Sequence, residues 1–162
     1  MIGATVKKID WKNLSYYDFI GIVAVTAILL FVLYFGWLWH ATYDYRIQMR
    51  DQMVEMYQQL PNPIPPIEDD YGVHKRWLVY CVTGTREFNR DLKDNEFDLY
   101  GEKLVEQGWQ IDKKYTDSNQ YGKSTSIVLR KGDFLFEITR WEGKKICRFH
   151  LIKEDWIYNK GF

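Results

Sequence analysis

Hydrophobic residues are concentrated near the start of the chain, where residues 19–39 contain no charged side chain. As an α-helix this segment would extend about 31 Å, close to the ~30 Å thickness of the hydrocarbon core of a bilayer. A buried core helix seldom runs so far without a charge, and the segment is too long for the apolar part of a cleavable signal peptide. We therefore expect an uncleaved transmembrane signal anchor with aromatic belts at its two ends, formed by Tyr16, Tyr17, Trp37, Trp39, Tyr43 and Tyr45.

Basic residues on the two sides of this segment suggest its orientation. Lys7, Lys8 and Lys12 precede it, whereas Arg46 and Arg50 follow it. Because flanks rich in Lys and Arg stay on the cytoplasmic side, the small excess before residue 19 favours a cytoplasmic N-terminus. The sequence thus predicts a single-pass membrane protein with a short cytoplasmic (or matrix-side) arm at residues 1–18 and an extracytoplasmic C-terminal domain.

Residues 40–60 contain neither Gly nor Pro, so a stalk helix is expected there. Spacings of 4, 3 and 4 positions place four apolar residues on one face of this helix: Met49, Met53, Met56 and Leu60. Methionine is flexible and suits adaptable contacts, so we predict that this methionine stripe binds a partner subunit or a second copy of the chain. The alternative is that the chain's own globular domain covers the stripe.

All four prolines of the chain lie just after the stalk, at Pro61, Pro63, Pro65 and Pro66. Proline ends a helix and favours extended polyproline II backbone, which acts as a semi-rigid spacer. We therefore interpret residues 61–72, including the acidic residues 68–70, as a Pro-rich linker.

The alternation of apolar and polar residues predicts a small globular domain at residues 73–162. Strands are expected at residues 77–83, 109–115, 127–130, 134–139 and 145–153, and a helix at residues 95–107. Asp94 or Asn95 is suited to cap the start of the helix, and Gly108 to end it. The resulting β-α-β-β-β-β order predicts an α+β fold of two layers, an antiparallel sheet with one helix across it.

Composition narrows the function classes. The 162 residues include 22 Lys and Arg and 22 Asp and Glu, so the net charge is zero and nothing favours a nucleic-acid partner. The two cysteines, Cys81 and Cys147, are too few for a disulfide scaffold or a four-cysteine zinc site. They would form a disulfide if their strands are neighbours, or remain buried free thiols.

Residues with catalytic or metal-binding chemistry are few. The histidines are His40, His74 and His150, and no spacing of a known metal site or phosphate loop is present. A nucleophile–base pair of Cys81 with His150 is conceivable, but no motif supplies an oxyanion hole or an orienting group. We expect no cofactor, no metal and no enzymatic activity.

The end of the chain is rich in aromatic residues, with Trp156, Tyr158 and Phe162 within the last seven positions. A frayed tail would not favour this composition, so we predict that these rings bind a partner or dock on a surface.

These features favour a non-enzymatic subunit of a larger membrane complex, with an accessory, scaffold or assembly role. Its expected partners are the lipid bilayer and other membrane subunits, contacted through the transmembrane helix and the stalk. The alternative is a membrane-anchored extracytoplasmic domain that binds a ligand or senses one. A membrane-anchored enzyme is the least favoured hypothesis.

Overall fold

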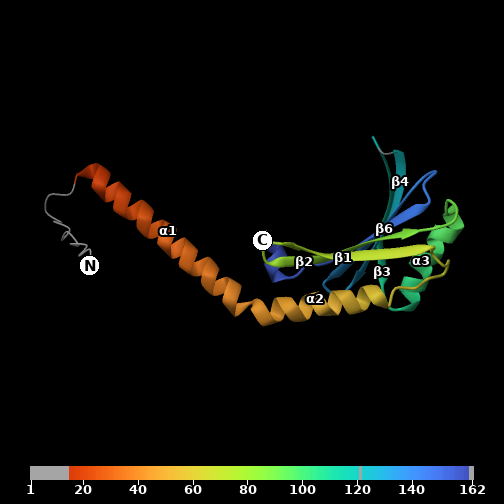
Figure 1. Cartoon of the computed structure of the whole chain (residues 1–162), viewed down its shortest axis with the longest axis horizontal. Coiled ribbons are helices and arrows are strands. Elements are labelled where there is room, and N and C mark those ends of the chain that lie inside the picture. The colour runs from red at the N-terminus through yellow and green to blue at the C-terminus, as the bar shows by residue number, and fades with distance from the viewer. Residues whose placement is uncertain (1–14, 121, 161–162) are drawn as a thin grey trace, which may run out of the picture. The chain divides into compact units, whose positions relative to one another are not determined.

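The structure, a computed structural model, describes residues 15–120 and 122–160. The chain divides into two compact units, Met1–Tyr43 and Asp44–Phe162. In chain order (Figure 1) the elements are α1 (Tyr16–Ala41), α2 (Tyr43–Gln58), β1 (Glu68–Arg76), β2 (Val79–Glu87), α3 (Asp94–Glu106), β3 (Gln110–Asn119), β4 (Gly122–Lys131), β5 (Phe134–Trp141), β6 (Ile146–Lys153) and α4 (Trp156–Asn159).

The first unit is built on α1, which includes the whole apolar segment at residues 19–39. Ser15 caps its start, because the Ser15 hydroxyl accepts a hydrogen bond from the Asp18 amide at 3.2 Å and the Asp18 carboxylate accepts one from the Ser15 amide at 3.1 Å. This helix is long and apolar enough to cross a membrane, as the sequence predicts. The lysines on which the predicted orientation depends, Lys7, Lys8 and Lys12, lie outside the described residues.

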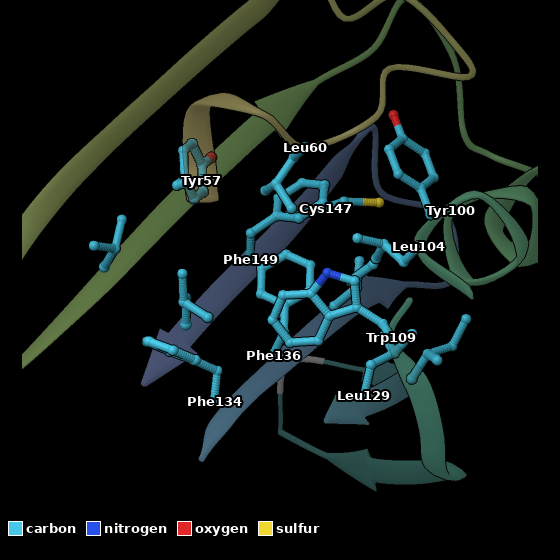
Figure 2. Packing of buried hydrophobic residues seen from close by; sticks show 14 of the residues in the cluster. Tyr57, Leu60, Tyr100, Leu104, Trp109, Leu129, Phe134, Phe136, Cys147 and Phe149 are labelled. Carbon is cyan, nitrogen blue, oxygen red and sulfur yellow. The ribbon is translucent and has the colours of Figure 1, made fainter. Parts of the chain in front are cut away.

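The second unit is an α+β domain with a six-stranded antiparallel sheet in the order β1-β2-β6-β5-β4-β3. Both α2 and α3 contribute buried residues to a core on one face of the sheet. Figure 2 shows Tyr100 and Leu104 from α3 in this core, where the Tyr100 ring centroid lies 5.8 Å from that of Phe149. The predicted α+β class with an antiparallel sheet is therefore confirmed, but α2 also contributes to the core and a sixth strand belongs to the sheet.

The sixth strand is β1, where the sequence predicts the end of a linker. It pairs with β2 from Glu68 to Arg76, so the acidic residues 68–70 are part of the sheet. Hydrophobic alternation fails to reveal it because β1 lies at the edge of the sheet and nearly all its residues are exposed. β3 and β4 also pair beyond the ranges expected for their strands, as far as Asn119 and Gly122.

The predicted helix at residues 95–107 matches α3 within one position at each end. The residue at its N-cap is Lys93 rather than Asp94 or Asn95, and the Lys93 amide donates to the Glu96 carboxylate at 2.9 Å. Gly108 follows the helix with a φ of 87°, as expected for a glycine that ends it in the left-handed conformation.

The structure corrects the preferred interpretation of the methionine stripe. Met49, Met53 and Leu60 are buried in the core of the second unit, and Met56 is partly buried against it. The alternative therefore holds: the chain's own sheet covers the stripe, which is not a free docking face. The reason is that α2 is a separate helix within the globular unit rather than a continuation of α1.

The Pro-rich segment does not carry the chain away from α2, as a spacer would. Arg86 donates to the Pro61 carbonyl at 3.0 Å, Tyr100 donates to the Ile64 carbonyl at 3.2 Å, and the Ile67 amide donates to the Glu87 carbonyl at 2.7 Å. These hydrogen bonds hold residues 61–67 against the domain. The chain therefore passes directly from α2 back to the sheet at β1.

Candidate functional site

The face of the sheet opposite the core, which we call the open face, carries the hollows described below. Because side chains alternate along a strand, the residues between the buried core positions point to this open face. Their types are mainly polar or aromatic: Thr83 and Thr85 from β2, Arg148 and His150 from β6, and Glu137, Thr139 and Trp141 from β5. The strand register places Thr85, Arg148 and Thr139 in one row across the open face, and Thr83, His150 and Glu137 in the next.

Three hollows on the open face share one residue, Arg148. The largest measures about 620 Å³ and is lined by Thr85, Gln120, Trp141, Lys144, Ile146 and Arg148. The second, of about 480 Å³, lies over β1 and β2 and includes His74, Cys81 and Thr83. The third, of about 380 Å³, lies over β5 and β6 and includes Glu137 and His150. Arg148 is thus the side chain around which the open face is hollowed.

The Arg148 guanidinium is positioned by an aromatic ring. It lies over the Trp141 indole, 5.6 Å from the ring centroid. Within the described part of the chain it makes no ion pair and no side-chain hydrogen bond. An exposed guanidinium stacked on an aromatic ring keeps its N–H donors available, in a defined orientation, for an anion.

Two carboxylates line the smaller hollows together with Arg148: Asp70 in the second hollow and Glu137 in the third. Tyr115 donates its hydroxyl to the Glu137 carboxylate at 2.6 Å, and this hydrogen bond, with burial, raises the pKa of Tyr115. The hydroxyls of Ser126 and Thr139 share a hydrogen bond of 2.7 Å across β4 and β5. These contacts fix the polar groups beside the hollows.

Two titratable groups of the open face, His150 and Cys81, favour their neutral forms. Burial lowers the pKa of His150, and the nearby Arg148 and His74 lower it further, against an opposing effect of Glu137. Burial also raises the pKa of Cys81, which disfavours the reactive thiolate. No hydrogen bond among the described residues joins Cys81 to His150, so the geometry gives no support to a nucleophile–base pair. The absence of enzymatic activity stays a prediction.

Of the two alternatives for the cysteines, the structure shows free thiols and not the possible disulfide. Cys81 and Cys147 are both free, although their strands β2 and β6 are neighbours. Cys147 pairs with Arg86, five positions along β2 from Cys81, and Cys147 points into the core whereas Cys81 lines the open face. At about 3.3 Å per residue this separation exceeds the reach of a disulfide. Burial raises the pKa of the Cys147 thiol to about 12.

The aromatic tail forms a short helix, α4, that is capped by Asp155. Ile157 anchors α4 because its side chain is fully buried, whereas Trp156 and Tyr158 remain 48% and 37% exposed. Phe162 lies outside the described residues. The sequence pattern of this short segment does not identify Ile157 as the buried residue of α4. Binding of a partner by Trp156 and Tyr158 stays a prediction.

Within residues 15–120 and 122–160, no group of three His, Cys, Asp or Glu side chains is arranged to hold a metal ion. No protein-family model, no curated protein and no solved structure matches this chain. The open face is therefore interpreted from its own geometry.

Proposed function

We propose that this chain is a membrane-anchored domain that binds a small anionic ligand on the open face of its sheet. The observation that carries the proposal is the unpaired Arg148 guanidinium at the point where three hollows meet. In this proposal α1 spans the membrane, residues 1–18 are cytoplasmic, and the sheet is extracytoplasmic. The chain acts by binding and not by catalysis.

The largest hollow supports an anion with an apolar body. Arg148 and Lys144 supply two cations, and none of its lining residues is acidic. Trp141 and Ile146 supply apolar surface beside these cations. A pocket with an apolar wall and a few convergent polar groups is typical of small-molecule sites. A guanidinium binds a carboxylate through charge-assisted hydrogen bonds.

An accessory role in a larger complex is the second hypothesis. The methionine stripe gives it no surface, because the sheet of the same chain covers that stripe. Ligand binding is favoured because the open face offers hollows beside an unpaired cation, whereas the stripe is already covered.

The test compares three probes with the full chain in phosphatidylcholine nanodiscs, measured by calorimetry against empty discs. The probes are 2-naphthoate, its neutral analogue 2-naphthalenemethanol, and acetate, which lacks a ring. We expect 2-naphthoate to bind most tightly. Arg148→Met should raise its Kd about tenfold or more, since hydrogen bonds to a charged group contribute ~1.5–3 kcal/mol.

The control is Lys145→Met, which removes one positive charge at an exposed position outside the hollows and should leave the Kd unchanged. Thr85→Trp places a ring at an exposed position that lines the largest hollow, and it should abolish binding. Binding that is insensitive to both Arg148→Met and Thr85→Trp would place any ligand elsewhere and contradict the proposal.

A further inference from the structure

We propose that one end of the globular unit lies in the headgroup region of the bilayer in which α1 is anchored. We call this the aromatic end, and its residues are Arg76, Trp77, Trp156, Tyr158 and Lys160. The proposal rests on membrane anchoring by α1 and is independent of ligand binding on the open face.

The strand register brings these residues to the same end of the sheet. Cys81 of β2 lies opposite Ile152 of β6. Continuing two residues along each antiparallel strand places Val79 beside Glu154. The turn at Trp77, which joins β1 to β2, therefore lies beside the residues that lead into α4.

The chain enters the globular unit at this end. Tyr45, near the start of α2, donates its hydroxyl to the Asp155 carboxylate at 2.5 Å. Asp155 is also the N-cap of α4, so the start of α2 is fixed directly to the start of the aromatic tail. Tyr45 follows the last residue of the apolar segment 19–39 by only six positions. The aromatic end is thus the part of the domain that the chain reaches first after leaving the membrane.

Three exposed rings at this end suit the membrane–water interface. Trp77 is 70% exposed, and Trp156 and Tyr158 are also exposed. Trp77 adopts a φ of 54°, an uncommon backbone conformation for a large side chain, although the protein leaves most of its ring exposed. Tryptophan and tyrosine are enriched where an apolar ring body meets lipid and its polar tip meets water.

Two cations accompany the rings. Arg76 is exposed, and Lys160 lies 5.8 Å from the centroid of the Trp156 ring. Neither makes an ion pair with a carboxylate among the residues that the structure describes. Basic side chains near a membrane surface are attracted to lipid phosphates, and more strongly to anionic lipids.

The test measures quenching of tryptophan fluorescence by lipids brominated close to the headgroup, with the full chain in nanodiscs. The contribution of Trp77 and Trp156 is the difference between the wild type and the variant Trp77→Phe/Trp156→Phe. We expect brominated lipid to remove this contribution. Trp141→Phe is the matched control, since Trp141 lies on the open face and its contribution should persist in brominated discs.

Charge provides the second measurement. Adding phosphatidylglycerol to the discs should increase the quenching, and Arg76→Gln/Lys160→Gln should remove this increase. Circular dichroism should show unchanged folding, because the altered side chains are exposed. If the Trp77 and Trp156 contribution is unquenched in both kinds of disc, the aromatic end faces water or a protein partner and the proposal is wrong.

Discussion

Among single residues, Arg86 shows most clearly how the domain holds a buried charge. Its side chain is only 2% exposed and lies 4.7 Å from the Phe149 ring centroid. Its Nε donates to the Asp69 carboxylate at 2.9 Å, and Tyr57 donates to the same carboxylate at 3.2 Å. Asp69 therefore neutralises a buried guanidinium and joins β1, β2 and α2. Burial, followed by the charge of Asp69, raises the pKa of Tyr57, so its hydroxyl stays protonated.

Asp69→Ala should lower the free energy of unfolding by about 2–4 kcal/mol, because it leaves Arg86 buried without its counter-charge. Asp69→Asn keeps an acceptor and should cost less. The neighbouring Asp70→Ala is the control, because Asp70 is exposed on the other side of β1 and should change stability by less than about 0.5 kcal/mol. Urea unfolding of the full chain in detergent checks these values. Equal effects of Asp69→Ala and Asp70→Ala would contradict a structural ion pair.

At the scale of elements, the packing of α2 on the sheet depends on a close approach at Gly84. A Cβ at Gly84 would lie 1.8 Å from the Tyr57 hydroxyl oxygen, so any larger residue displaces the Tyr57 ring. Tyr57 also packs against Tyr71 and Phe149, with ring centroids 4.9 and 6.4 Å away. The position of α2 is thus determined by a ring that fits over a glycine.

Gly84→Ala should destabilise the domain by about 1–3 kcal/mol, the usual cost of overpacking a core. Gly72→Ala is the matched control in β1, where the nearest atom, on the His74 ring, is 3.4 Å from the new Cβ. The double variant Tyr57→Ala/Gly84→Ala should show coupling in a double-mutant cycle, since removal of the ring relieves the clash. Additive effects in that cycle would mean that α2 does not approach the sheet as described.

Elements with strong local signals could be predicted from the sequence. The helix α3 follows from its apolar spacing and from Gly108, and the β4–β5 hairpin follows from its turn at Gly132. The edge strand β1 could not, because its exposed polar residues show no alternation. The open face was equally hidden, since Arg148 and Trp141 come together only through the register of β5 and β6. Periodicity assigns a residue to a face but does not identify its neighbours across strands.

For the whole molecule, the two units separate two tasks. The apolar α1 is suited to anchoring, and the sheet of the second unit provides a hollowed face and an aromatic end. Orientation decides which compartment supplies a ligand to the open face. It depends on Lys7, Lys8 and Lys12 before the apolar segment and on Arg46 and Arg50 after it.

The predicted orientation can be measured by cysteine labelling with a membrane-impermeant maleimide. Ser118→Cys lies at an exposed position of β3, and Thr5→Cys reports on the N-terminal arm. Both are introduced with Cys81→Ser, because Cys81 is only partly buried; Cys147 is buried in the core and should not react. In spheroplasts of expressing bacteria, we expect the Ser118→Cys variant to be labelled while the Thr5→Cys variant reacts only after lysis. The physical reason is that the side of the membrane with more lysines is retained in the cytoplasm.

The opposite labelling pattern would place the open face in the cytoplasm. Replacing Lys7 and Lys8 with Gln should weaken the preference, since Arg46 and Arg50 would then outnumber Lys12.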